Sequence, residues 1–225
     1  SSAASDVYKR QLLRRAREVG AWVHIDGAFG LWAATAAKLK PLTRGIELAD
    51  SWSFDGHKTL NTPYDSGVIM CRDRDALVTA LQASGAYITY SDHRDGMLHT
   101  PEMSRRSRIF ELWAALKYLG RTGLDELVYG LHLRALQFAR ELEQQGFEIL
   151  NDVVFNQVLV ACENDALTTA TIGLIQQSGE CWVGGTQWQQ RQVSRVSVCS
   201  WATTEADVTR SVQAFVEARE QASNT

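Results

Sequence analysis

Short apolar runs alternate with amphipathic stretches along the first part of the chain. The runs end at polar residues or glycine and are typical of buried strands. The predicted strands are residues 21–25, 49–54 and 67–71. The predicted helices, from the spacing of apolar positions, are residues 12–19, 31–38 and 74–83. Strands that alternate with helices indicate an α/β layer with a mainly parallel sheet.

A polar segment without any period, residues 85–104, follows this layer. Loops of such length are usually functional or mobile. Residues 109–119 then have the pattern of a helix, which is expected to end at Gly120.

The second part of the chain has a different pattern. Apolar residues recur at helical spacing from Leu124 to Leu142, and Gly146 ends that helix. Thr204 and Asp207 resemble a capping box that starts a last helix. Between these two helices lie the predicted strands 147–150, 154–161, 181–183 and 193–199 and a predicted helix, residues 165–177. The pattern predicts a unit of helices packed on an antiparallel sheet.

These patterns divide the chain into residues 11–105 and residues 106–225, and the second part begins with the linking helix. Apolar residues make up 45% of the sequence, which is enough for a hydrophobic core. Residues 1–10 differ in character from both parts. We interpret them as a non-native or disordered leader and exclude them from the fold prediction.

Charge and composition exclude several classes of function. A net charge of −3 gives no electrostatic basis for binding nucleic acid or an anionic membrane. The longest apolar stretch, residues 20–37, contains Asp26, which costs roughly 2.5 to 3.5 kcal/mol at a membrane centre, so we interpret the stretch as a buried strand and turn. The 4 cysteines form no Cys-x-x-Cys pair, so no metal site is predicted and a reducing cytoplasm is expected.

The residues that carry chemistry lie at two predicted strand ends. Asp26 ends the first strand, and Lys58 follows the second. A lysine amine can bind the aldehyde of pyridoxal phosphate covalently, and a carboxylate can keep the pyridine nitrogen of that cofactor protonated. The alternatives are a solvated strand-end lysine, and an aspartate that caps a helix or binds a metal together with His24.

Three neighbouring residues bear on the same site. Ala28 is small where a flat ring could lie against the strand end. His57 can donate a hydrogen bond to a cofactor phosphate or, alternatively, to a local group. Asp55 lies three residues before Lys58 and has no assigned role, because a carboxylate repels a phosphate.

The stretch from Trp22 to Arg72 resembles the fold-type I pyridoxal phosphate enzymes, and in particular the group II amino acid decarboxylases. The family pattern is His-x-Asp-x-Ala, then Asp-Ser, then His-Lys followed by Asn and Asp-x-Gly. The matching residues are His24, Asp26, Ala28, Asp50, Ser51, His57, Lys58, Asn61, Asp65 and Gly67. The similarity continues to residue 205. It implies part of a PLP-transferase large domain, with a mainly parallel sheet and helices, followed by a C-terminal α+β small domain.

The resemblance also implies roles for single residues. Lys58 is the lysine that binds the cofactor, and Asp26 pairs with the pyridine nitrogen. Ala28 packs on the ring, and His57 contacts the phosphate. Arg195 matches an arginine that binds the substrate carboxylate, and a solvent-facing strand arginine is the alternative.

Residues 85–100 match a flexible loop of the family, in which a tyrosine protonates the substrate carbon after carbon dioxide leaves. Tyr87 and Tyr90 are the two candidates here. The loop is short, however, so another fate of the same carbon stays open. The leading prediction is decarboxylation of an L-amino acid, and the alternatives are an aminotransferase, a carbon–carbon lyase and an inactive fragment.

The resemblance implies partners as well. A complete family member has on the order of 200 residues before the aspartate, which is the share of a large domain. We therefore expect this chain to be a C-terminal portion that by itself binds pyridoxal phosphate weakly or not at all. The expected partners are a small amino acid substrate and, in the full-length protein, a second copy in a homodimer.

Overall fold

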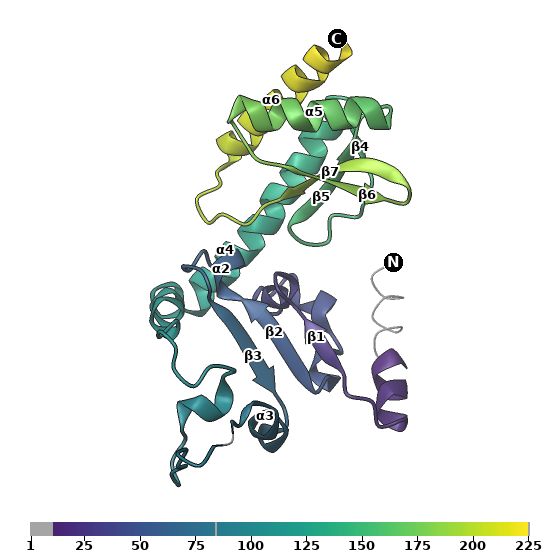
Figure 1. The fold of residues 1–225 in the computed structure, drawn as a ribbon. Coiled ribbons are helices and arrows are strands. Elements are labelled where there is room, and N and C mark those ends of the chain that lie inside the picture. Colours follow the sequence, from purple (N-terminus) through teal and green to yellow (C-terminus); the bar gives the residue numbers. More distant parts are fainter. Residues whose placement is uncertain (1–10, 84, 225) are drawn as a thin grey trace.

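The computed structural model describes residues 11–83 and 85–224, so the leader expected at residues 1–10 lies outside the described residues. Figure 1 shows two sheets joined by the long helix α4 (Ile109–Gln144). The first sheet belongs to an α/β unit, and the second carries helices and antiparallel strands only. An α/β unit followed by an α+β unit is the fold class that the sequence predicts.

The first sheet consists of β1 (His24–Asp26), β2 (Ser51–Asp55) and β3 (Gly67–Cys71), in that order. All three strands overlap the predicted apolar runs, although β1 begins at His24 and not at residue 21. β1 and β2 are parallel, whereas β3 is antiparallel to β2 with its first residue opposite Asp55. The carboxyl ends of β1 and β2 therefore share one edge of the sheet. β3 ends at the opposite edge, where α3 (Arg74–Leu81) follows.

The helix predicted over residues 31–38 is wrong. The chain forms three short 3-10 turns instead: η1 (Gly30–Thr35), η2 (Lys40–Thr43) and η3 (Ile46–Leu48). A helix this short is marginal by itself, so tertiary contacts decide the conformation. Trp32 is buried and donates its indole N–H to the backbone oxygen of Asp55 over 2.8 Å, which fixes the first turn against β2.

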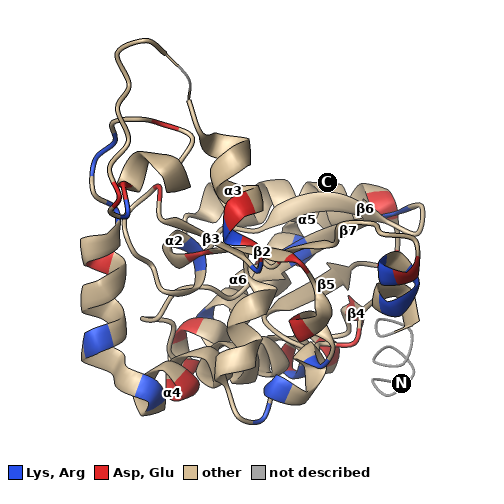
Figure 2. Ribbon diagram, turned by 90° about the horizontal axis from the view of Figure 1, so that it is seen from below, with Lys and Arg blue, Asp and Glu red and all other residues tan. Residues whose placement is uncertain are grey.

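The segment after α3 has little regular structure, as predicted. It contains one short turn, η4 (Gly96–His99), and otherwise irregular backbone up to the start of α4. Figure 2 shows it projecting from the molecule beside α3. The same view shows basic and acidic residues interspersed over the ribbon.

Helix α4 connects the two units. The sequence predicts two helices separated at Gly120, and the structure interrupts α4 at that residue (φ 59°, ψ −165°). Leu112 and Val128 pack into the core of the first unit, which also contains Trp32 and Leu60. The later turns of α4 pack into the core of the second unit. One helix thus contributes to both cores.

The second sheet is antiparallel, with the order β4-β5-β7-β6. Its strands are β4 (Glu148–Ile149), β5 (Gln157–Ala161), β6 (Gly184–Trp188) and β7 (Arg191–Ser197). Figure 1 shows α5 (Asp165–Ser178) and α6 (Glu205–Ser223) on the same side of this sheet. Phe215, Leu142 and Ile175 are the largest fully buried apolar side chains of its core.

The strand predicted over residues 181–183 is wrong, because β6 begins only at Gly184. β6 and β7 form a hairpin whose turn residues, Gln189 and Gln190, have φ values of 48° and 67°. Such turns normally carry Asn or Gly, which tolerate positive φ. Glutamine is not a typical turn residue, so the sequence pattern does not reveal this hairpin. The predicted strand is therefore placed before Gly184, where β6 begins.

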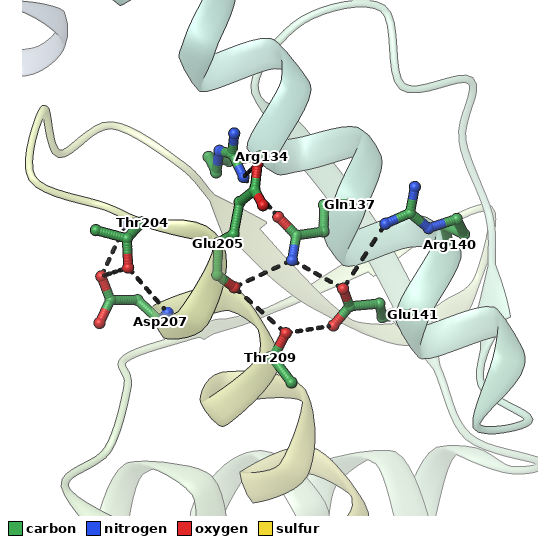
Figure 3. Close-up of polar contacts among 8 residues, drawn as sticks. All are labelled: Arg134, Gln137, Arg140, Glu141, Thr204, Glu205, Asp207 and Thr209. Atoms are coloured by element: carbon green, nitrogen blue, oxygen red, sulfur yellow. Dashed lines mark hydrogen bonds and ion pairs between the residues drawn. The ribbon is translucent and has the colours of Figure 1, made fainter.

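The predicted capping box is present at the start of α6. Thr204 accepts a hydrogen bond from the Asp207 backbone, and the Asp207 side chain accepts one from the Thr204 backbone. Figure 3 shows how the first turns of α6 are held on α4. The buried Gln137 amide donates to the Glu205 backbone oxygen (3.0 Å) and to Glu141 (2.8 Å). Within residues 11–83 and 85–224, no helix combines the length and the apolar character needed to cross a bilayer.

Candidate functional site

Asp26 and Lys58 lie at the same edge of the first sheet. Asp26 is the last residue of β1, and Lys58 lies in the short helix α2 (Gly56–Thr59) that directly follows β2. Because β1 and β2 are parallel neighbours, with Asp26 opposite Ser53, their carboxyl ends present both side chains at one edge. Open α/β sheets bind ligands at this edge.

The Asp26 carboxylate is exposed and has only one hydrogen-bond partner in the described part of the chain, the Ala28 backbone N–H at 3.2 Å. This leaves acceptor capacity for a ligand N–H. The alternative of a metal site with His24 is not supported. The His24 ring nitrogens lie 2.8 Å from Ser51 Oγ and 3.1 Å from Ser53 Oγ instead.

Lys58 is held by its neighbours. Its Nζ lies 3.0 Å from Asp55 Oδ2 and 4.9 Å from the centre of the Phe29 ring. The side chain is 31% exposed, which is intermediate between a buried and a freely solvated lysine. The amine is therefore accessible and has a carboxylate beside it.

His57 makes local contacts. Its Nδ1–H donates to the Ser66 backbone oxygen over 3.1 Å, and Nε2 lies 3.7 Å from Asp55 Oδ2. The ring also packs against Tyr64, with 4.1 Å between the centroids. The local hydrogen bond is the alternative that the sequence left open. The predicted contact of His57 with a phosphate stays a prediction.

A cavity of about 370 Å³ lies between the turn after β1 and the segment before β5. Asp26 and Ala28 line it from the first unit, and Asn156 and Gln157 line it from the second. Residues of both units therefore line this cavity, and Asp26 is among them, whereas Lys58 and Arg195 are not.

Arg195 lies in β7, on the exposed side of that strand. Its neighbours Ser194 and Val196 are buried, and side chains alternate between the faces of a strand. Among residues 11–83 and 85–224, Arg195 has no hydrogen bond or ion pair with another side chain. This placement fits both a ligand-binding arginine and a solvent-facing one.

Among the described residues, no contact joins Tyr87 or Tyr90 to Lys58. Both residues follow α3, which lies at the opposite edge of the sheet. The Tyr90 hydroxyl donates to the Ala83 backbone oxygen, and Tyr87 is 83% exposed. The proposed role of either tyrosine as a proton donor stays a prediction.

The cluster of arginines before α4 has a structural role. Arg108 forms an ion pair with Asp65, and Arg106 Nη2 donates to the Tyr64 backbone oxygen. The hydrogen bond from Arg108 lowers the pKa of Asp65 to about 2. Residues 106–108 are thereby attached to Tyr64 and Asp65, and the Tyr64 ring contacts His57.

Asn61 is a residue of this site to which sequence analysis gave no role. Its side chain donates to the backbone oxygens of Lys58 and Cys199, both at 2.9 Å, and accepts from the Trp201 backbone N–H at 2.9 Å. Apart from its place in the family pattern, the signal in the sequence is that asparagine tolerates positive φ, and Asn61 has φ 50°.

The site fits a pyridoxal phosphate cofactor on its own geometry. It offers an amine, a carboxylate with free acceptor capacity and a small residue, Ala28, at neighbouring strand ends. Gly27, which lies between Asp26 and Ala28 in the chain, is buried. A Cβ at this position would lie 2.5 Å from Leu31 Cβ, so the turn after β1 requires glycine here. Fold and site together define an α/β protein of the kind that binds a cofactor at the carboxyl edge of its sheet.

Comparison with known proteins identifies the family. Residues 8–162 match the family described as "Pyridoxal-dependent decarboxylase conserved domain". This match spans more than half of the chain, so the chain belongs to that family. The family and its cofactor are those that the sequence pattern around Asp26 and Lys58 predicts.

Individual relatives agree with this assignment. Aspartate 1-decarboxylase of Aliivibrio fischeri is 30% identical over 144 residues, which cover 64% of this chain and 26% of that protein. Aromatic-L-amino-acid decarboxylase of Bos taurus is 26% identical over 192 residues, covering 81% and 39%. The crystal structure of Oryza sativa TDC with PLP and tryptamine has the same fold, with a TM-score of 0.87 at 21% identity, covering 94% of this chain and 47% of that one. The chain thus spans less than half the length of these relatives.

Proposed function

We propose that this chain forms part of a pyridoxal phosphate-dependent enzyme that converts an L-amino acid to its amine and carbon dioxide. The observation that carries the proposal is the placement of Asp26 and Lys58 at the carboxyl ends of two adjacent parallel strands. Membership of the decarboxylase family supports it. Pyridoxal phosphate, when bound, supplies an electron sink for the bond that breaks at the substrate α-carbon.

Each residue of the site has a distinct role in this proposal. Lys58 would supply the amine that holds the cofactor, and Asp55, 3.0 Å away, orients that amine. Asp26 accepts the N–H of the pyridine nitrogen and keeps it protonated, because a carboxylate favours a neighbouring cation. Ala28 leaves room for the ring, and His57 directs a ring nitrogen to the phosphate.

The substrate is an amino acid. Arg195 provides a guanidinium for its carboxylate, and the absence of a protein partner for this side chain among the described residues supports that role. The cavity between Asp26 and Gln157 provides the space for the substrate side chain. The relatives act on amino acids of different side-chain chemistry, aspartate and aromatic amino acids, as their names state.

A second reaction type rests on one observation. Neither Tyr87 nor Tyr90 contacts Lys58 among the described residues, and both follow α3, which lies at the opposite edge of the sheet. A second copy could bring the exposed Tyr87 to the site, which is one reason to propose a homodimer. If no tyrosine acts there, an aminotransferase or a carbon–carbon lyase is the alternative.

Two further assignments belong to this proposal. We assign the protein to the cytoplasm, and this is supported by four free cysteines, Cys71, Cys162, Cys181 and Cys199. We also propose residues 11–105 and 106–225 as separate domains. Their separate sheets support this division, and α4 packs on both cores and ties them together.

Borohydride trapping tests the function. The chain is incubated with pyridoxal phosphate, reduced with borohydride and mapped by mass spectrometry. The label is expected on Lys58 in preference to Lys38, and it should disappear from that peptide in Lys58→Ala. Equal labelling of all lysines would contradict the proposal. Product analysis with amino acids then separates the reactions, since amine and carbon dioxide indicate decarboxylation and a keto acid or aldehyde indicates an alternative.

A further inference from the structure

Asn61 connects the turn that carries Lys58 to the second unit. Its amide group donates to the Lys58 and Cys199 backbone oxygens and its oxygen accepts from the Trp201 backbone, so every bond is to main chain. Two of these partners lie 138 and 140 residues away in the sequence. A side chain that bridges such distant segments fixes their relative position.

The segment that Asn61 contacts is itself held at both ends. On one side, the buried Asn156 side-chain amide donates to the Val198 backbone oxygen over 2.9 Å. The Val198 N–H donates in turn to the Asn156 backbone oxygen over 2.9 Å. On the other side, the Thr204 capping box starts α6, which is fastened to α4. Residues 199–203 therefore form a short bridge between two anchored points, and Asn61 binds its middle.

This bridge also leads to Arg195. The arginine lies four residues before Cys199, and β7 runs without interruption up to Ser197. A displacement of the bridge relative to Lys58 would therefore move Arg195 relative to Lys58. The three bonds of Asn61 oppose such a displacement.

We propose that Asn61 is a positioning residue that sets the separation between the Lys58 amine and the Arg195 guanidinium. The inference rests on the proposed function, which assigns the cofactor to Lys58 and the substrate carboxylate to Arg195. The residue type fits this role, because asparagine adopts the required positive φ and its short amide reaches three backbone groups.

The test compares Asn61→Gly with Gln189→Gly. Both residues have positive φ, 50° and 48°, so glycine removes a side chain in each case without backbone strain. Gln189 lies in the β6–β7 turn, away from Lys58. Hydrogen exchange is measured at the Trp201 amide and, as a monitor of folding, at Val158 and Val196. Lys58 is assayed by borohydride trapping of pyridoxal phosphate.

We expect Asn61→Gly to raise the exchange rate of the Trp201 amide about tenfold and to lower Lys58 trapping several-fold, with unchanged exchange at Val158 and Val196. Gln189→Gly should change neither. Faster exchange with normal trapping would overturn the positioning role, because a merely structural bond would behave in that way. Equal trapping at Lys58 and Lys38 in the unsubstituted chain would instead refute the proposed function, and with it this inference. Faster exchange at Val158 and Val196 would show general destabilisation and also contradict the proposal.

Discussion

The ammonium of Lys58 lies 3.0 Å from Asp55 Oδ2, one helical turn earlier in the chain. Asp55 ends β2 and occupies the N-cap position of α2, but its side chain does not cap the helix. The carboxylate is thus available to Lys58, and it lies 3.7 Å from His57 Nε2 as well. Asp55, which sequence analysis left without a role, therefore contacts both basic side chains that follow it.

Replacing Asp55 by Asn should make Lys58 more reactive toward a neutral acylating reagent at pH 7. The carboxylate holds the Lys58 amine at 3.0 Å, so its loss leaves the amine freer to reach the reagent. We expect a several-fold higher rate at Lys58, measured by mass spectrometry. Lys38 in the same sample is the internal control. An unchanged ratio of Lys58 to Lys38 labelling would show that Asp55 does not hold the amine.

Asp26→Ala should weaken the binding of pyridoxal phosphate without destabilising the chain. Asp26 is exposed and accepts one local hydrogen bond, so its removal should change the free energy of unfolding by less than about 0.5 kcal/mol. The lost pairing with the pyridine nitrogen should raise the dissociation constant about tenfold or more. Absorbance titration measures binding, and urea unfolding measures stability. Equal affinity in the two proteins would remove Asp26 from the site.

The elements with strong local signals were predictable. The strand over residues 67–71 and the capping box of Thr204 and Asp207 lie where the sequence indicates, because both depend on residues close in the chain. The break at Gly120 was also predictable, since glycine adopts positive φ readily. The conformation of residues 31–38 was not, because the contact between Trp32 and β2 outweighs local helix propensity.

The residues of the site divide in the same way, into those that local signals predict and those that depend on contacts distant in the sequence. Asp26 and Lys58 were found because each follows an apolar strand, and two parallel strands place their ends together. The hydrogen bonds that join Asn61 to the second unit could not be found in this way. It depends on a backbone segment 138 residues distant, and no local pattern reports such a contact.

Acid should loosen the segment before α4 through Asp65. Arg108 lowers the pKa of this carboxyl to about 2, below its value of about 3.9 in an unfolded chain. The folded state therefore binds the proton less readily, so this contribution to stability is present above about pH 4 and is lost as the pH falls toward 2. The rate of proteolysis within residues 102–108 should therefore increase as the pH is lowered from 5 to 2. Asp65→Asn should be cleaved readily throughout and lose this pH dependence, and an unchanged profile would contradict the assignment.

Gln137→Leu should destabilise the contact between α4 and α6. The Gln137 amide is 8% exposed and donates to both Glu205 and Glu141, as Figure 3 shows. Leucine removes the donor of both hydrogen bonds, and each lost intramolecular hydrogen bond costs about 0.5 to 1.5 kcal/mol. Urea unfolding should show a decrease of that size. The matched control is Gln213→Leu, because Gln213 is exposed on α6 and bonds only to Glu217 among the described residues, so its replacement should change stability by less than about 0.5 kcal/mol. Equal effects of the two substitutions would mean that the Gln137 contacts do not fasten α6 to α4.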